Sequence, residues 1–455
     1  MSRLCSPKTS RLNVIRNSTM IPSSDELREL TKRMAACIQD GLGKETHPKA
    51  TVKCFQTYVQ DLPTGRELGT YLALDLGGSN FRVLKAELGT DEIRMEQETY
   101  SCSQDLMTGT GENLFDYIAQ CLARFVEQTG SSSAASKKPL PVGFTFSFPM
   151  RQRTVDSGVL TKWTKGFRCD GVVGQDVVQL LRRSIAKHAG LHVNVCAILN
   201  DTVGTLMSSA WNDAKTKLGL VVGTGTNCCY VERVGAVGLY AGDPGKKQMV
   251  INLEWGSFGD NGELEGLVTK YDLEVDAGSV NPKQQLFEKM VSGMYLGETF
   301  RLLLLDMAKE QVIFDGKIPD VLERPRGITA DVISGIERDA PGRYEHAQDC
   351  LRKVGINAAD SDLELIRHAA QNVSSRSARL VAAGLVAILN RVDEPEITIG
   401  VDGAVHRHHP HYHDILVNTI NELLENKKKI NVVSSEDGSG RGAAVVAAAV
   451  CRRSP

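Results

Sequence analysis

One pattern occurs twice, far apart in the chain, and it constrains the fold more than any other feature. A buried strand is predicted over 71–74; it breaks at Gly77-Gly78, and a second strand is predicted over 81–88. Later, the apolar run 218–222 is followed by a glycine-rich turn at 223–226 and by a further apolar run. Two strand–turn–strand units of this kind predict two related domains that face one ligand.

The rest of the chain alternates between the two kinds of secondary structure. A helix is predicted over 23–41, where Ser23 and Glu26 have the spacing of a capping box, and another is predicted over 112–128. Further buried strands are predicted over 142–148, 193–199 and 397–401. Strands that alternate with helices indicate the α/β class.

Composition excludes several kinds of protein. The 455 residues include 42% hydrophobic residues, enough to offset the entropy of ordering a globular chain. The 53 basic and 55 acidic residues leave a formal charge of −2, which argues against nucleic acid or an anionic membrane as the main partner. The apolar stretch 443–450 is too short for a membrane span, so none is expected.

The cysteines and the first residues of the chain give indications of the cellular compartment. Eleven cysteines occur without a single CxxC pair, so a zinc ribbon or a thioredoxin-type site is not expected. Residues 1–16 are basic and contain no acidic residue, which is typical of a flexible tail, although a transit peptide has the same character. We expect reduced thiols and a cytoplasmic protein.

The first glycine turn has two interpretations. Glycines let the backbone approach a ligand, and successive N–H groups can then hold phosphate oxygens. Asp75, at the end of the first strand, could hold a metal ion through water, and Arg82 could reach a phosphate. The same turn could be an ordinary hairpin, in which glycine supplies a positive φ. The second turn favours the phosphate interpretation.

Polar residues follow several strands. Asn200-Asp201-Thr202 comes directly after the predicted strand 193–199, where Asp201 could cap a helix or accept a hydroxyl proton. Glu254 follows another apolar run, and Glu288 lies in a predicted helix. Carboxylates and amides, together with Lys165, suit a polyhydroxy ligand, because each carboxylate accepts several hydrogen bonds.

Two common nucleotide-binding motifs are absent from the sequence. Gly245-Lys246 is not followed by Ser or Thr, so the chain has no P-loop there, and no GxGxxG segment opens a helix after a strand. Five histidines crowd the segment 406–413, where metal binding is conceivable. No cysteine or pair of carboxylates lies near them in the sequence, so we expect no metal site there.

Several long motifs together resemble the hexokinase family, of the kind with a single catalytic unit. They are LALDLGGSNFRVL from Leu72, FTFSFPMRQRTVDSGVLTKWTKGF from Phe144, NDTVGT from Asn200, VGTGTNCCY from Val222, INLEWGSFGD from Ile251, EKMVSGMYLGE from Glu288, IGVDG from Ile399 and SEDGSGRGAA from Ser435. They follow one another in the family's order between about residues 23 and 451.

The resemblance implies a fold and a division of the chain. It implies two actin-like (ribonuclease-H-like) α/β domains, each with a mixed sheet flanked by helices and with the ligand cleft between them. Residues 67–200 plus 435–455 would form the small domain, 17–66 plus 201–434 the large domain, and 1–16 the flexible tail.

The resemblance also implies an activity, the ATP-dependent phosphorylation of the 6-hydroxyl of glucose, with mannose and fructose as related substrates, in the first step of glycolysis. Asp201 would be the general base, and Lys165 would approach the transferring phosphoryl group. The residues implied to hold the sugar are Ser147, Thr164, Lys165, Asn200, Asp201, Asn227, Glu254 and Glu288. The residues implied around ATP are Asp75, Gly77, Gly78, Ser79, Asn80, Arg82, Gly223, Thr224, Gly225, Thr226, Ser334, Gly403 and Ala404, with Asp75 acting on Mg²⁺ through water. A cytoplasmic monomer is expected.

Two segments depart from the family's pattern. Residues 326–331 are one residue shorter than usual, and 406–410 read His-Arg-His-His-Pro in place of the usual Tyr-Lys-Leu-His-Pro. Both lie on the side expected to bind adenosine. A competing hypothesis is a hexokinase-like sensor that binds sugar without phosphorylating it, but the sequence retains Asp201, Lys165, Asp75 and Arg82.

Overall fold

The computed structural model describes residues 20–78, 80–90, 92–131, 138–243, 245–435 and 437–452. Among the residues of the sequence analysis, the predicted tail 1–16 and Ser79 of the first glycine turn lie outside these ranges.

The first sheet has five strands in the order β4-β3-β2-β5-β8. Their bounds are β2 Gly69–Leu76, β3 Asn80–Leu88, β4 Ile93–Ser101, β5 Leu140–Phe146 and β8 Val193–Leu199. Strands β2, β3 and β4 form an antiparallel meander, whereas β5 and β8 run parallel to β2.

The second sheet has six strands in the order β1-β11-β10-β9-β12-β13. Their bounds are β1 Phe55–Gln56, β9 Thr216–Val222, β10 Thr226–Arg233, β11 Gln248–Asn252, β12 Glu396–Asp402 and β13 Lys429–Ser434. Here β9, β10 and β11 form the meander, and β12 and β13 run parallel to β9. A separate hairpin pairs β6 Met150–Thr154 with β7 Ser157–Leu160.

The two sheets therefore repeat one topology, apart from the added strand β1. Each begins with a hairpin whose glycine turn was predicted from the sequence, and both strand–turn–strand units are confirmed. The predicted strands 142–148, 193–199 and 397–401 are confirmed as β5, β8 and β12 within two residues.

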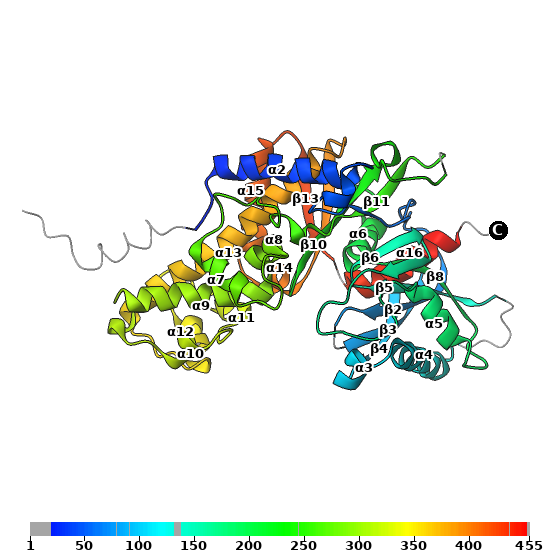
Figure 1. Ribbon diagram of the computed structural model, residues 1–455, viewed down its shortest axis with the longest axis horizontal. Helices are drawn as coiled ribbons and strands as arrows, with labels where there is room; N and C mark the ends of the chain where they lie inside the picture. The colour runs from blue at the N-terminus through cyan, green and yellow to red at the C-terminus, as the bar shows by residue number, and fades with distance from the viewer. Residues whose placement is uncertain are drawn as a thin grey trace, which may run out of the picture.

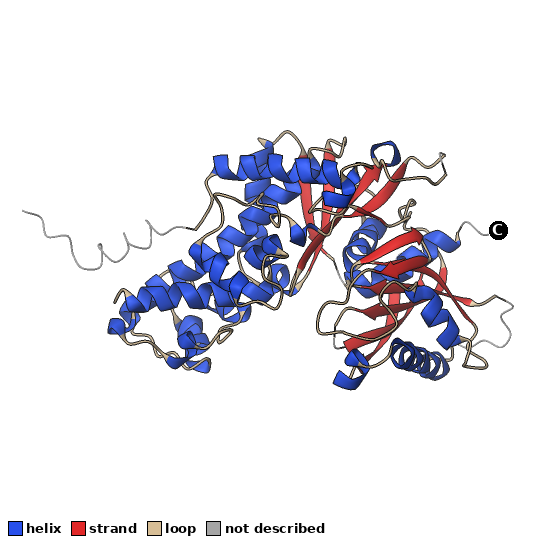
Figure 2. Ribbon diagram, viewed as in Figure 1, coloured by secondary structure: helices blue, strands red, loops and turns tan. Residues whose placement is uncertain are grey.

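Helices surround both sheets (Figures 1 and 2). Their bounds are α2 Ser24–Leu42, α3 Gln104–Thr108, α4 Gly111–Gln128, α5 Val177–Ile185, α6 Asp201–Asn212, α7 Lys270–Ala277, α8 Leu286–Val291, α9 Gly293–Lys309, α10 Asp320–Glu323, α11 Ala330–Ile336, α12 Glu345–Lys353, α13 Asp360–Leu389, α14 Ala404–His408, α15 Tyr412–Leu424 and α16 Gly438–Cys451. The capping box of Ser23 and Glu26 opens α2 as predicted, and α4 confirms the second predicted helix.

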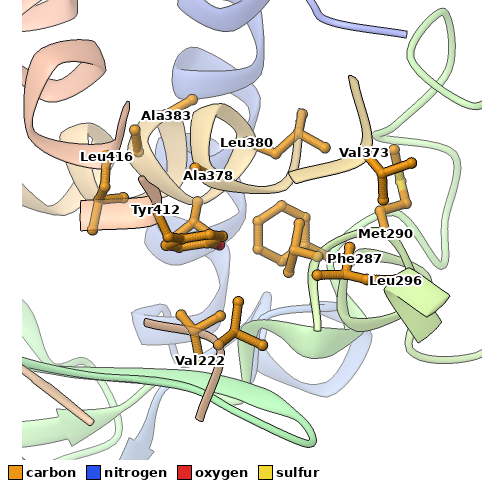
Figure 3. Close-up of a cluster of buried hydrophobic side chains, with 14 of the residues drawn as sticks. Val222, Phe287, Met290, Leu296, Val373, Ala378, Leu380, Ala383, Tyr412 and Leu416 are labelled. Atoms are coloured by element: carbon orange, nitrogen blue, oxygen red, sulfur yellow. The ribbon is translucent and has the colours of Figure 1, made fainter. Parts of the chain in front are cut away.

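The outer faces of the two sheets carry separate cores. On the first sheet, alternate residues of β2, such as Leu72 and Leu74, pack against α4 and α5. On the second sheet, β9 and β10 pack against α13, α2 and α15. Figure 3 shows part of this larger core, in which Val222 from the end of β9 lies near Phe287 and Tyr412.

A third core lies between the sheets and contains α6 and α16. Each of these helices follows the last strand of its sheet, so they occupy equivalent places in the repeat. Their contact depends on glycine: a Cβ on Gly442 would lie 2.3 Å from the Cα of Gly204. Side chains larger than hydrogen at this crossing would force the two helices apart.

Across the described ranges, the helices lack the combination of length and apolar character that a bilayer crossing requires.

Candidate active site

A hydrogen-bonded group of amides and one carboxylate lies where β10 and β11 meet. The Nδ2 of Asn227 donates to Oε1 of Glu254 at 3.1 Å, to Oδ1 of Asn252 at 2.8 Å and to Oδ1 of Asn200 at 3.3 Å. Asn252 donates to the same Oε1 of Glu254 at 2.9 Å, and the backbone N–H of Glu254 donates to Asn227. These contacts hold Glu254 in one orientation and direct it toward the space between the sheets.

The second carboxylate of this wall comes from α8. Oε2 of Glu288 accepts the backbone N–H of Thr226, the first residue of β10, at 3.1 Å. Gly225 must be glycine here, because a Cβ would lie 2.6 Å from the same oxygen. The predicted position of Glu288 in a helix is confirmed, and the side chain turns toward the second glycine turn.

Asp201 is the first residue of α6 and lies beside this group. The cap of α6 is Asn200, whose Oδ1 accepts the N–H of Thr202 at 3.0 Å. Burial raises the pKa of Asp201, the ammonium of Lys165 lowers it, and the carboxylates of Asp75 and Asp402 raise it again. The net direction is upward, so Asp201 holds a proton more readily than an ordinary aspartate.

The other two carboxylates are affected in the same direction. Burial raises the pKa of Glu254, and the charges of Asp201 and Glu288 add to the effect. Burial also raises the pKa of Glu288, although the N–H of Thr226 and the Lys165 ammonium oppose it. The three carboxylates thus share one poorly solvated space, and the charge of Lys165 acts on all three of them.

Lys165 lies on a loop after β7 that reaches this space from the first sheet. The residue has a left-handed backbone with φ of +56°, its side chain is exposed, and its Nζ lies 5.7 Å from the ring centre of Phe148. Thr164 accepts the N–H of Phe167 and so closes the turn. Ser147 is buried, and its N–H donates to the carbonyl of Leu76 at the end of β2.

A network of charged groups lies at the first glycine turn. Oδ2 of Asp75 accepts Nη2 of Arg82 at 2.6 Å and Oγ of Ser439 at 2.7 Å, and Arg82 also pairs with Asp437 at 2.6 Å. Burial lowers the pKa of Arg82, but the two carboxylates outweigh it and raise the pKa. The network joins β2 and β3 to the start of α16, so the predicted Asp75 and Arg82 lie together.

The first glycine turn is open at Gly78, where a ligand would need the backbone. A Cβ on Gly78 would meet nothing within 4 Å, so the protein itself does not require glycine there. Gly403 follows β12 with φ of +112°, and a Cβ on it would collide with the carbonyl of Val222. That contact brings the start of α14, including Ala404, against the second turn at Gly223. Asn80 is exposed and accepts a hydrogen bond from Ser101.

A cavity of about 600 Å³ opens from the second glycine turn. Its walls include four residues predicted on the nucleotide side: Gly223, Thr224, Ser334 and Ala404. Residues of both unusual segments line it as well, among them Arg326, Ile328, His408 and His409. The two departures from the family's pattern therefore lie in one place.

The histidine segment is part of this wall. Nε2 of His409 lies 3.1 Å from Oε1 of the buried Glu337, and His406 lies 3.2 Å from Nδ1 of His413. Burial, with His413 and Arg407 nearby, lowers the pKa of His406 to about 4. Among the described residues, no cluster of three or more histidines, cysteines or carboxylates could hold a metal ion.

Four residues of the site were not identified from the sequence. Asn252 orients Glu254, Ser439 and Asp437 complete the network at Asp75, and Asp402 accepts the N–H of Gly403 and pairs with Arg407. Asn252 lies two residues before Glu254 at the end of an apolar run. Its role in the site could have been predicted from that position. Asp437 and Ser439 are distant in sequence, and only the fold brings them to the site.

Two sheets of one topology, each with a glycine turn facing a shared polar cleft, define an α/β protein of the actin-like ATPase fold. Two family models described as hexokinase match residues 15–211 and 217–449. The chain belongs to the hexokinase family, which confirms the resemblance and the fold class.

Individual relatives agree with this assignment. Human hexokinase-2 is 44% identical over 440 residues, covering 94% of this chain and 47% of the relative, and rat hexokinase-2 is 43% identical. The chain therefore spans about half the length of these curated relatives. A solved hexokinase of Schistosoma mansoni in complex with glucose has a TM-score of 0.86 and 37% identity, with 97% of this chain and 98% of that one covered. Another hexokinase crystal structure has a TM-score of 0.85 and 32% identity, with 97% and 99% covered.

Proposed function

We propose that this chain transfers a phosphoryl group from ATP to the 6-hydroxyl of D-glucose and related hexoses, including mannose and fructose. The products would be hexose 6-phosphate and ADP, as in the first step of glycolysis. The observation that carries the proposal is the convergence of Asp201, Glu254 and Glu288 on one space that also receives the charge of Lys165.

The sugar would be held by hydroxyl-binding groups on both sides of the cleft. The described hydrogen bonds of the Glu254 side chain fall on Oε1, and that of Glu288 falls on Oε2, so each presents a second oxygen to sugar hydroxyls. Carboxylates fixed by amides suit hydroxyl donors because they are oriented before the ligand arrives. The full proposed set is Ser147, Thr164, Lys165, Asn200, Asp201, Asn227, Glu254 and Glu288.

Asp201 would act as the general base. A raised pKa makes its carboxylate a better proton acceptor than an ordinary aspartate, while the ammonium of Lys165 opposes the rise. Asn200 caps α6, and Oδ1 of Asp201 accepts the N–H of Thr202 as well, so Oδ2 of Asp201 would face the 6-hydroxyl. Lys165 would then stabilise charge on the transferring phosphoryl group.

ATP would lie across the two glycine turns with its adenosine in the 600 Å³ cavity. Gly77, Gly78, Ser79, Asn80, Arg82 and Asp75 would face the phosphates from one side. Gly223, Thr224, Gly225 and Thr226 would face them from the other, with Ser334, Gly403 and Ala404 toward the adenosine. Backbone N–H groups at such turns suit phosphate oxygens.

Mg²⁺ fits the donor chemistry near the phosphates. The carboxylates at the turns, Asp75 foremost, are the hard oxygen donors that Mg²⁺ prefers, and it commonly takes one or two protein carboxylates together with substrate phosphates. Bound there through water to Asp75, the ion would neutralise phosphate charge during transfer. Asp75 itself is held in place by Arg82 and Ser439.

The two sheets of the repeat would belong to two different domains. We take 67–200 plus 435–455 as the small domain and 17–66 plus 201–434 as the large domain, which would close over the sugar and exclude water. We propose a cytoplasmic monomer.

A kinetic assay tests the proposal. Purified chain with glucose, ATP and Mg²⁺ should form glucose 6-phosphate, detected by a coupled dehydrogenase, and excess EDTA should abolish the reaction. The competing sensor hypothesis expects glucose to raise the melting temperature without any product. That result would reject the proposed reaction and favour the sensor.

A further inference from the structure

Two cysteines far apart in the sequence lie in contact at the edge of the first sheet, where β8 meets the end of α16. The Sγ atoms of Cys196, in β8, and Cys451, the last residue of α16, are 3.5 Å apart. A disulfide bond is about 2.0 Å long, so small side-chain adjustments would bring the sulfurs together. None of the residues proposed to bind sugar or nucleotide takes part in this contact.

A β-bulge directs Cys196 toward its partner. Val142 of β5 pairs with Val195, but the next residue, Gly143, pairs with Ala197, so Cys196 is the extra residue of β8. Strand side chains normally alternate between faces, and a bulge interrupts that alternation. Val195 and Ile198 pack in the core on the α4 side, whereas Ala197 packs on the α16 side. The bulge places Cys196 on the α16 side as well, where it meets Cys451.

The end of α16 is held at a point that solvent reaches. Cys196 is buried, whereas Cys451 is only half-buried. The following residue, Arg452, pairs with Glu67 at 2.7 Å and donates to Thr64 at 3.1 Å. The thiol pair therefore lies beside the segment that connects the second sheet to the first, and Cys451 is the more accessible residue of the pair.

We propose that Cys196 and Cys451 form a peroxide-sensitive dithiol that converts reversibly to an intramolecular disulfide. The oxidant is hydrogen peroxide. In the first step the sulfur of Cys451 attacks one peroxide oxygen, the O–O bond breaks, and a sulfenic acid and one water form. In the second step the sulfur of Cys196 displaces the hydroxyl of that sulfenic acid, giving the disulfide and a second water. Two thiols lose two electrons and two protons, and one peroxide is reduced to two waters.

The electrostatics of the pair agree with that order of events. The hydrogen bond between the two thiols lowers the pKa of Cys451, although burial opposes this. The same hydrogen bond, together with burial, raises the pKa of Cys196. The thiolate is the form that reacts with peroxide. Cys451 is therefore expected to react first, because it ionises more easily than Cys196 and is the more accessible residue.

Peptide mapping tests the proposal on the full chain and needs no kinase activity. The reduced protein is treated with hydrogen peroxide, free thiols are alkylated, and the protein is digested with trypsin without reductant. The expected tryptic fragments 188–215 and 442–452 contain one cysteine each, so a link between them has a single interpretation. We expect one linked species that lacks two hydrogens and disappears on treatment with dithiothreitol.

Variants separate this pair from general oxidation. Cys451→Ser should abolish the linked species, whereas Cys350→Ser, at the other half-exposed described cysteine, should leave it unchanged. The link would span 255 positions, so the oxidised wild-type protein should melt about 5 °C higher than the reduced protein. Cys451 recovered as sulfinic acid, or linked to another cysteine or a second chain, would overturn the proposal. If Cys451→Ser does not fold, the wild-type map alone decides.

Discussion

The side chain of Asn200 accepts the backbone N–H of Thr202 at 3.0 Å and caps α6, one position before Asp201. From the sequence, Asp201 could have been either the cap or a base. The structure shows that the neighbouring residue, Asn200, is the cap of α6. Asp201 shares that N–H through Oδ1 at 2.8 Å, and its Oδ2, on a carboxyl whose pKa burial raises, is open to a catalytic role.

Replacement of Asp201 by Asn tests this separation. The amide oxygen can still accept the N–H of Thr202, as Oδ1 does at 2.8 Å, so the melting temperature should stay near that of the wild type. An amide cannot take the hydroxyl proton, so kcat should fall by roughly 10²–10⁴-fold, or about 3–5 kcal/mol of barrier. Steady-state kinetics and thermal melts with glucose decide the matter. More than a tenth of the wild-type kcat would refute the base assignment.

Lys165→Gln should move the acid limb of the pH profile. The ammonium lowers the pKa of Asp201, so its removal raises that pKa and carries the fall of kcat/KM for glucose to higher pH. The rate at the optimum should fall as well, but the shift of the limb is the diagnostic quantity. Lys162→Gln, three residues earlier and also exposed, is the control and should leave the limb in place. An unmoved limb in Lys165→Gln would show that the two charges do not interact.

Glu254→Gln should stabilise the ligand-free protein while removing the response to glucose. Burial raises the pKa of Glu254 in the folded state, so the ionised form costs stability at pH 7 that the neutral amide does not. The gain in melting temperature should disappear below the ordinary pKa of glutamate, where the wild-type carboxyl is protonated in both states. Thermal melts at pH 7 and pH 4, with and without glucose, measure both effects.

The exposed Glu265 supplies the matched control for that experiment. Glu265→Gln should change neither the melting temperature nor the rise that glucose produces. A Glu254→Gln protein that melts lower than the wild type at pH 7 would mean that the hydrogen bonds from Asn227 and Asn252 require the full charge.

Gly78→Val should weaken ATP use without disturbing the fold. A Cβ there meets no protein atom within 4 Å, so stability should be unchanged, but the side chain would occupy space that a phosphate needs. We expect the KM for ATP to rise by about tenfold or more, equivalent to about 1.4 kcal/mol. Gly235→Val, which also meets nothing within 4 Å, is the control. Equal KM values for the two variants would contradict the phosphate-binding role of the first turn.

Local sequence signals predicted the framework well. Apolar runs and glycine turns located the strands of both hairpins, and a capping box located the start of α2. These elements are decided by neighbouring residues, so the sequence carries their signal directly. The 30-residue helix α13 gave no such signal because apolar residues lie on most of its faces, as its burial on several sides requires.

The site was predicted as a set of residues but not as a geometry. The residues that face the cleft, such as Glu254 and Asn227, could be named from motifs. The contact between Asp75 and Ser439 joins positions 364 residues apart, and no local pattern encodes it. The bulge that turns Cys196 toward α16 depends in the same way on how β5 and β8 pair across the sheet.

The place of α16 on the first sheet has a consequence for biosynthesis. This helix packs so closely that a Cβ on Gly143 of β5 would lie 2.0 Å from the carbonyl of Ala443. The strands it covers are complete at Leu199, whereas the helix begins at Gly438. At typical translation rates of about 5–20 residues per second, the ribosome needs roughly ten to fifty seconds to synthesise the intervening chain. Throughout that interval the nascent first sheet presents an uncovered apolar face, which makes it a natural client for chaperones that bind exposed hydrophobic surface.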